Sequence, residues 1–410
     1  MDGDQADLAQ LLSFAGPGAG PLPGRVNCRF FFALLYTKEN LIMFKQLATR
    51  VGIEAIERGW MPDSVTRKLV RGHCTTRLRE TRRENAELPE HGLAKFAEAM
   101  RQGPIARVPE LANEQHYEVP SEFFRWMLGP KLKYSCCLFE SPESSLADAE
   151  VAALRTTCER ADIQDGMDVL ELGCGWGSLT LWMLENFPQL KVSAVSNSAS
   201  QRSFILQQAE KLGAADRLNI VTADMNEFQT EQSFDRIVSC EMFEHMFNYE
   251  QLLSRISSWL KRDGKLFIHI FCHTQFAYEF HSEGASNWMG KYFFSGGIMP
   301  SLDLLSRFDQ DLAVCQQWTW EGTHYEKTCN AWLELLDQNK RQVLEILSAN
   351  YGPREAKRWL QRWRLFLIAC AELFGYEAGQ QWMVGHFLLE PQPSGKNEET
   401  LAVAPEKNFV

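Results

Sequence analysis

The 410-residue sequence lacks several features that would point to particular classes of protein. It has eleven cysteines but no C-x-x-C pair and no cysteine–histidine spacing typical of a zinc site, so we expect no metal. It has no basic stripe, and its net charge of −11 argues against nucleic acid as a partner. An acidic chain of this kind is compatible with a cationic substrate.

Long hydrophobic runs are also scarce. The apolar run at residues 30–36 is too short to cross a bilayer and is followed by Lys38-Glu39-Asn40, so it predicts the start of a helix. No signal-peptide pattern is visible. Because the cysteines show no disulfide framework either, we expect reduced thiols, a cytoplasmic location and no stable insertion into a membrane.

The chain divides into four predicted regions. Residues 1–24 are rich in glycine and proline and are predicted to be disordered. Residues 25–115 are predicted to form a helical cap. The spacing of apolar residues predicts one helix at 40–58, and the start signal Pro62-Asp63-Ser64 predicts another at 65–71. Residues 116–390 form the predicted catalytic domain, and residues 391–410 form a polar tail.

A glycine-spaced turn is the most informative feature that is present. Residues 169–177 read Val-Leu-Glu-Leu-Gly-Cys-Gly-Trp-Gly and run from an apolar strand into a helical stretch. Gly173, Gly175 and Gly177 permit a tight turn at positive φ and a close approach by a ligand. The spacing lacks the later third glycine of a dinucleotide motif, so it favours S-adenosylmethionine over NAD. The alternative is a tight connection that binds nothing.

The segments that follow alternate between strand-like and helix-like patterns, which predicts an α/β fold with a parallel sheet and helices on both faces. Strands are predicted at residues 191–196, 218–224, 234–239 and 265–271, and helices at residues 200–212 and 249–260. Ligands bind such sheets at the carboxyl ends of the strands. Several polar residues fall at these ends and favour a ligand site there: Glu171, Asn197, Asp224, Glu241, Glu244 and His245.

The chemistry is predicted to lie in the segment from Glu241 to His245. On a helical turn, Glu241, Glu244 and His245 share one face, since they occupy positions i, i+3 and i+4. Two carboxylates beside an imidazole attract a cationic amine and can accept a proton. We predict His245 as the base, oriented by Glu244 and assisted by Glu241. The alternative is a solvated helix start whose acids complement the helix dipole.

A group of aromatic residues would suit a pocket that stacks a ring and attracts a cation. Its members are Trp288, Tyr292, Phe293, Phe294 and Tyr325. Cys370 is a candidate nucleophile by residue type alone. It lies in an apolar helical run, where cysteine usually packs as a small hydrophobe, and methyl transfer to an amine needs no thiolate.

Ordered motifs on both sides of the glycine turn carry a family resemblance. They are His116-Tyr117-Glu118-Val119-Pro120, Lys133-Tyr134-Ser135-Cys136-Cys137, Ser196-Asn197-Ser198 with Gln201, Met242-Phe243-Glu244-His245-Met246, Tyr292-Phe293-Phe294 and Cys370-Ala371-Glu372-Leu373-Phe374-Gly375-Tyr376. The series spans roughly residues 105–390 and closely resembles the coclaurine N-methyltransferase group. That group is a branch of the S-adenosylmethionine-dependent cyclopropane fatty acid synthase superfamily.

The resemblance implies a Rossmann-like class I methyltransferase sheet with an N-terminal helical cap and a helical insertion before the last strand. It also implies a set of S-adenosylmethionine-binding residues. Tyr134 and Ser135 would close over the methionine end, Gly173, Gly175 and Gly177 would line it, Asn197 and Gln201 would approach the ribose, and Asp224 and Met225 would meet the adenine. Many methyltransferases of this fold carry an acidic residue where this chain has Ser196-Asn197.

The leading functional prediction is an N-methyltransferase acting on a small amine, aromatic or alkaloid-like. The rival is an enzyme that methylates or cyclopropanates unsaturated acyl chains, because Cys136, Glu244, His269 and Tyr325 resemble residues that hold bicarbonate in the synthases. A third alternative, a cofactor-binding protein without catalysis, is disfavoured by Glu244-His245. The sequence leaves open the amine, the number of methyl groups and the oligomeric state, with a homodimer as one alternative.

Overall fold

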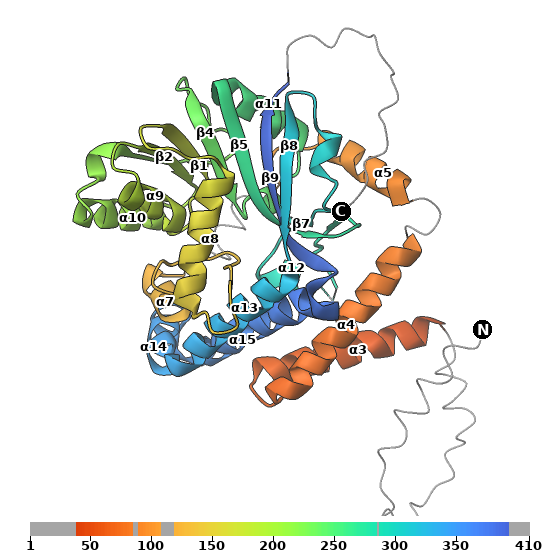
Figure 1. Ribbon diagram of the computed structural model, residues 1–410. Helices are drawn as coiled ribbons and strands as arrows, with labels where there is room; N and C mark the ends of the chain where they lie inside the picture. Colours follow the sequence, from red (N-terminus) through yellow and green to blue (C-terminus); the bar gives the residue numbers. More distant parts are fainter. Residues whose placement is uncertain (1–37, 85–88, 108–118, 285–286, 393–410) are drawn as a thin grey trace, which may run out of the picture. The chain divides into compact units, whose positions relative to one another are not determined.

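The structure is a computed structural model that describes residues 38–84, 89–107, 119–284 and 287–392 (Figure 1). The predictions for residues 1–24, 30–36 and 393–410 lie outside these ranges, as do residues 116–118 of the first motif. The chain separates into one unit of residues 1–49 and a second of residues 50–410. The central sheet, the cavity and the residues around it belong to the second unit.

The described part of the predicted cap region is helical. Helices in and after this region are α3 (Lys38–Glu57), α4 (Asp63–Glu84), α5 (Pro89–Arg101), α7 (Ser121–Met127) and α8 (Leu146–Arg160). Helix α4 begins at the predicted start signal but continues well beyond residue 71, because buried residues continue to recur along it at Cys74, Leu78 and Thr81. The division of the chain into a cap and a catalytic domain stays a prediction.

A seven-stranded sheet forms the centre, in the order β3-β2-β1-β4-β5-β9-β8. The strands are β1 (Asp168–Leu172), β2 (Lys191–Ser196), β3 (Leu218–Thr222), β4 (Phe234–Cys240), β5 (Leu260–His273), β8 (Leu312–Trp320) and β9 (Trp382–Pro391). The first five strands in this order pair in parallel, as predicted. Strands β9 and β8, for which the sequence analysis assigned no residues, extend the sheet with antiparallel pairing. An apolar run indicates that a strand exists but carries no information on its direction.

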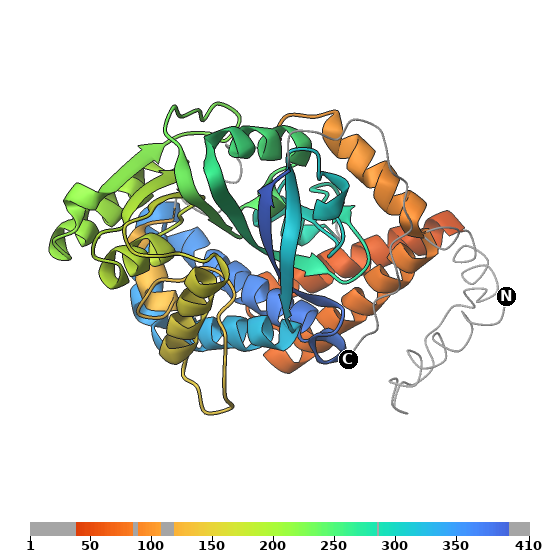
Figure 2. The same cartoon turned by 45° about the horizontal axis from the view of Figure 1, so that its top comes forward.

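Helices cover both faces of this sheet (Figure 2). Helices α9 (Ser178–Asn186) and α10 (Ala199–Lys211) contact β2 and β3 on one face, and α11 (Tyr249–Trp259) contacts β5 and β8 on the other. Helix α12 (Trp288–Tyr292) is short, and α13 (Gly322–Gln338), α14 (Lys340–Tyr351) and α15 (Pro353–Phe374) pack on one another, with α13 and α15 also contacting β9. Short elements complete the described chain: the 3-10 helices η2 (Ala215–Arg217), η3 (Phe243–His245), η4 (Leu305–Arg307) and η5 (Tyr376–Gly379), and the strands β6 (Tyr278–Glu279) and β7 (Ile298–Met299). Helices α13 to α15 form the helical insertion before the last strand, which is confirmed.

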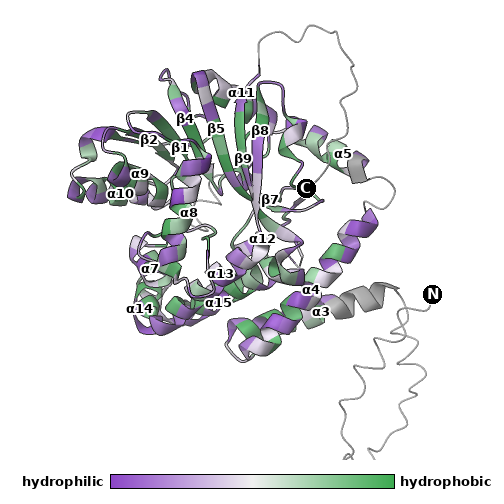
Figure 3. Cartoon of the chain, viewed as in Figure 1, coloured by the Kyte–Doolittle hydropathy of each residue, from purple (hydrophilic) through white to green (hydrophobic). Residues whose placement is uncertain are grey.

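Two hydrophobic clusters lie on opposite faces of the sheet. Neighbouring residues of β1 divide between them, since Val169 packs into one cluster and Leu170 into the other. In Figure 3, β9 is largely green, whereas β8 at the edge of the sheet is mostly pale or purple. No helix in the described ranges combines the length and the apolar character that crossing a bilayer requires.

Candidate active site

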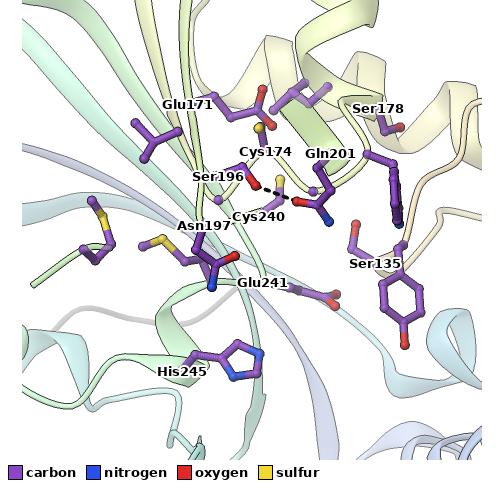
Figure 4. Close-up of a pocket in the computed structure, with 18 of the residues that line it drawn as sticks. Ser135, Glu171, Cys174, Ser178, Ser196, Asn197, Gln201, Cys240, Glu241 and His245 are labelled. Carbon is purple, nitrogen blue, oxygen red and sulfur yellow. Dashed lines mark hydrogen bonds between the residues drawn. The ribbon is translucent and has the colours of Figure 1, made fainter. Parts of the chain in front are cut away.

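A cavity opens at the carboxyl ends of β1, β2 and β4, where the sequence predicts a ligand site. Figure 4 shows Glu241 and His245 beside this cavity together with Ser135, Asn197 and Gln201. The cavity brings together most of the predicted cofactor residues. Those that line it are Tyr134, Ser135, Gly173, Gly175, Asn197, Gln201, Asp224 and Met225.

The glycine turn forms one wall of the cavity. All three glycines have positive φ, and the backbone N–H groups of Gly173 and Cys174 both donate to the carbonyl of Val195 at 3.0 Å. A Cβ on Gly177 would lie 2.7 Å from a side-chain carbon of Ile205, so this glycine serves helix packing and lies outside the cavity lining. A Cβ on Gly175 would meet no atom within 4 Å. Gly175 is therefore the glycine beside open space.

Several buried donors at the cavity are suited to a polar ligand. The side-chain atoms Trp176 Nε1, Ser178 Oγ and Gln201 Nε2 are buried and have no hydrogen-bond partner within the described chain. Gln201 is held in place because its Oε1 accepts from Ser196 Oγ at 2.7 Å, which leaves its amide nitrogen available. Orphaned buried donors of this kind are costly unless a ligand satisfies them. The cavity thus fits the hydroxyl and carboxylate oxygens of S-adenosylmethionine.

The acidic segment differs from the predicted helical turn. The 3-10 helix η3 covers only Phe243–His245, and Glu241 precedes it with φ of 49°, in the left-handed region. The expectation that Glu241, Glu244 and His245 share one helical face is therefore wrong. Glu241 and His245 both line the cavity, whereas Glu244 does not and is fully buried, with Oε1 accepting from the backbone N–H of Phe271 at 2.8 Å.

Three donors converge on the Glu241 carboxylate. Oε1 accepts from the backbone N–H of Cys136 at 2.9 Å and lies 3.1 Å from Nε2 of His269, while Oε2 accepts from the hydroxyl of Tyr325 at 2.6 Å. The set Cys136, His269 and Tyr325, which the sequence grouped with Glu244, therefore gathers around Glu241 instead. Because the three donors come from distant parts of the chain, no local pattern could reveal the partner.

The pKa values of the two buried glutamates, Glu241 and Glu244, are shifted by different surroundings. Burial raises the pKa of Glu241, but the nearby charge of Lys133 and the bonds from Cys136 and Tyr325 oppose this rise. Burial and the neighbouring charge of Glu241 raise the pKa of Glu244 well above its ordinary value. Glu241 is therefore the more acidic of the two carboxyl groups, because Lys133, Cys136 and Tyr325 favour its charged form while the charge of Glu241 disfavours ionisation of Glu244.

The predicted aromatic pocket is only partly assembled. Phe294 lies against the His245 ring with centroids 4.5 Å apart, and Tyr325 bonds to Glu241, so both adjoin the cavity. The other three make contacts elsewhere. Trp288 donates to Glu57 at 2.9 Å, Tyr292 faces the Arg362 guanidinium at 4.2 Å, and Phe293 stacks on Phe366 at 4.5 Å.

Other residues of the cavity were missed or assigned differently by sequence reasoning. Lys133 and Cys240 line it. Lys133 opens the motif that contains Tyr134 and Ser135 but was given no role, and Cys240 stands in no motif. Lys133 is buried and its Nζ donates to Ser135 Oγ and to the carbonyl of Cys136, both at 2.6 Å. Cys370 is absent from the cavity lining and packs against one of the two hydrophobic clusters.

A class I S-adenosylmethionine-dependent methyltransferase is the class of protein that this sheet order, glycine turn and cavity define. The chain belongs to the mycolic acid cyclopropane synthetase family, whose family model matches residues 107–383. It is 36% identical over 355 residues to the (S)-coclaurine N-methyltransferase of Thalictrum flavum subsp. glaucum, an alignment that covers 84% of this chain and 98% of that protein. The predicted family is thereby confirmed.

A solved structure supports the same assignment. A crystal structure of coclaurine N-methyltransferase bound to N-methylheliamine and SAH superposes with a TM-score of 0.79 at 35% identity, over 82% of this chain and 98% of that one. The cyclopropane-fatty-acyl-phospholipid synthase of Escherichia coli strain K12 is 28% identical over 67% of each chain. The chain is an S-adenosylmethionine-dependent N-methyltransferase, and the synthases that motivated the rival prediction are distant relatives.

Proposed function

We propose that the acceptor is a small aromatic or alkaloid-like amine and that Glu241 and His245 prepare its nitrogen for methylation. The observation that carries this proposal is that both side chains line the same cavity as the glycine turn. The relatives support the amine, since several act on alkaloid nitrogens by name, among them (S)-coclaurine and pavine N-methyltransferases.

The cofactor is held by the glycine turn and by polar residues around it, which together form the glycine wall of the cavity. When bound, S-adenosylmethionine supplies an electrophilic methyl group on a sulfonium sulfur. Gly175 leaves room for it, while Ser178 and Gln201 present unpaired donors to its polar groups. Tyr134, Ser135, Asn197, Asp224 and Met225 complete this wall.

Glu241 and His245 form the acidic wall of the cavity. Its role is to attract the protonated amine and to remove the proton from its nitrogen. Glu241 is the more acidic of the two buried glutamates, and its side chain is 10% exposed and lines the cavity. Its carboxylate attracts an ammonium group into the cavity. An ammonium has no lone pair, so it must lose a proton before its nitrogen can accept a methyl group. His245 takes that proton, directly or through water.

Glu244 lies outside the cavity lining and supports the acidic wall through a hydrogen bond to the backbone. Its carboxyl group is fully buried and bonds to the backbone of Phe271 in β5, so it fixes the turn that carries His245. Phe294 supports the His245 ring, and Tyr325 fixes Glu241. We assign Glu241 and His245 as the residues that meet substrate, and Glu244 as a positioning residue.

A screen of acceptors tests the proposal directly. The protein is incubated with S-adenosylmethionine carrying a labelled methyl group, a panel of aromatic amines and vesicles of unsaturated phospholipid, and the products are identified by mass spectrometry. We expect label on amine nitrogen and none on acyl chains. Transfer to acyl chains with no amine accepted would overturn the proposal.

The remaining predictions on partners and location belong to the same proposal. Ten cysteines of the described chain are free thiols, which supports a reducing, cytoplasmic compartment. The net charge of −11 supports the absence of a nucleic-acid partner. A homodimer is the assembly to test by light scattering, and cell fractionation tests the location.

A further inference from the structure

A line of hydrogen-bonded side chains runs from helix α8 to the cavity. Arg160 Nη1 lies 2.7 Å from Nδ1 of His386, Nε2 of His386 lies 2.8 Å from Nδ1 of His269, and Nε2 of His269 lies 3.1 Å from Oε1 of Glu241. Both imidazoles are completely buried. Only Glu241 has been given a role in the reaction above.

The sheet itself aligns these groups. His269 in β5 and His386 in β9 are directly opposed partners in the antiparallel ladder, and Arg160 is the last residue of α8. Trp320 of β8 covers the pair, with its ring 4.3 Å from that of His386 and 5.5 Å from that of His269. This cover keeps water from competing for the imidazole nitrogens.

The direction of every bond in the line follows from the arginine. A guanidinium can donate hydrogen bonds but cannot accept them, so Nδ1 of His386 must be the acceptor. The proton of His386 is then on Nε2 and is donated to Nδ1 of His269. The proton of His269 must in turn be on its Nε2, from which it is donated to Glu241.

The charge state of the two histidines agrees with this direction. Burial lowers the pKa of both His269 and His386 well below the ordinary value, and the charges of Arg160 and Lys133 act in the same sense. Both rings are therefore neutral at pH 7, and each has one donor and one acceptor nitrogen. The opposite tautomer of His269 would place a lone pair against Oε1 of Glu241.

We propose that Arg160 and His386 are positioning residues that fix the tautomer of His269 and so hold the Glu241 carboxylate as an acceptor facing the amine. The consequence for the reaction rests on the proposed function of Glu241. The line is not an exit path for the substrate proton, because its outer end is a guanidinium that cannot accept one.

Nitrogen NMR of the protein labelled with ¹⁵N-histidine tests the tautomers without any substrate. Nine histidines contribute signals, and those of His269 and His386 are assigned by their loss in His269→Gln and His386→Gln. We expect both residues as neutral Nε2–H tautomers at pH 7. A proton on Nδ1 of either ring overturns the proposal, whatever the substrate proves to be.

Kinetics of variants test the effect on the reaction. Arg160→Met keeps an apolar stem over Trp318 and Trp320 but removes the donor, so we expect kcat to fall about 10- to 100-fold, as for other outer partners of a reacting group, with S-adenosylmethionine affinity unchanged. Arg160→Lys restores a donor and should recover most of the activity. Equal activity of Arg160→Met and the wild type, or equal loss in both variants, overturns the proposal.

A second pair of variants covers the case in which Arg160→Met does not fold. Glutamine at position 386 can accept from Arg160 and donate to His269 but cannot relay protons, so His386→Gln should retain activity that His386→Leu loses. Loss of activity in both variants would contradict the proposal that His386 fixes the tautomer of His269.

Arg155→Met is the matched control for Arg160→Met, since Arg155 lies on the same helix in an ion pair with Glu140 at the surface. A failure of amine methylation itself would appear in the acceptor screen and leave the NMR result intact.

Discussion

The two walls of the cavity are built in different ways. The glycine wall is centred on one continuous segment, residues 169–177, whose turn follows from its own glycines. The acidic wall is assembled around Glu241 by Cys136, His269 and Tyr325, which are 105, 28 and 84 positions away in the sequence. The first wall is therefore a local property of the sequence, and the second is a product of the whole fold.

This difference predicts different kinds of sensitivity to mutation. On the glycine wall, the space itself matters, so a substitution acts by filling it. On the acidic wall, hydrogen bonds fix charge and orientation, so a substitution acts by changing the protonation state or position of one carboxylate. Substitutions on the glycine wall should therefore impair cofactor binding, and substitutions on the acidic wall should impair turnover.

The largest effect is expected from Gly175→Val. Because no atom lies within 4 Å of a Cβ at this position, the new side chain projects into the open space of the cavity and should abolish S-adenosylmethionine binding in calorimetry. Gly213→Val is the matched control, since Gly213 also has positive φ and open surroundings but lies in an exposed turn. Cofactor affinity that survives in a folded Gly175→Val protein would show that the glycine wall is misplaced.

His245→Ala should lower kcat by about 10² to 10⁴, the usual value of a general base, while cofactor affinity stays the same. The loss should shrink as pH rises toward the pKa of the amine, where free amine needs no base. If the acidic wall only orients the amine, the loss appears in KM and the pH profiles of kcat run in parallel. Profiles of both proteins decide between these accounts.

Tyr325→Phe removes one of the three donors to Glu241 and leaves the ring in place. A hydrogen bond to a charged group is worth about 1.5–3 kcal/mol, so kcat should fall about 10- to 100-fold. Tyr376→Phe is a useful control, because the Tyr376 hydroxyl bonds to Thr75 away from the cavity. Equal effects of the two changes on kcat would show that the Tyr325 hydroxyl does not support the Glu241 carboxylate in the reaction.

The smallest effect is expected in stability, at Glu171. Burial raises the pKa of Glu171 to about 8 from its ordinary value of 4.5. The folded state therefore keeps a proton that the unfolded state loses, and this stabilisation is complete below pH 4.5 and lost as pH rises to 8. Glu171→Gln stays neutral and can still accept from Thr180, so its Tm should match the wild type at pH 4.5 and exceed it at pH 8. A Tm difference that does not change with pH would contradict the raised pKa.

Most of the sheet could be predicted from the sequence because its signals are local. The bounds of β2 match the predicted residues 191–196, and the last strand follows a helical insertion as expected. The antiparallel direction of β9 and β8 could not be predicted, because strand direction depends on how the chain returns to the sheet.

The candidate site divides in the same way. Gly173 and Gly175 were found because the turn is a local signal, whereas Gln201 was found only through the family resemblance. The helical-face argument for Glu241 was wrong because its φ of 49° breaks the assumed geometry. His386 went unassigned, since a histidine within the apolar strand 382–391 gives no hint of its partners. The role assignments stay predictions for both walls.

The most direct test of the central claim compares binding and turnover in Glu241→Gln. The glutamine keeps the size of the side chain but removes the charge that attracts and orients the amine. The two-wall account predicts an unchanged calorimetric Kd for S-adenosylmethionine together with a fall in kcat/KM for the amine of about 10²-fold or more. A parallel loss of cofactor affinity, or turnover equal to that of the wild type, would contradict it.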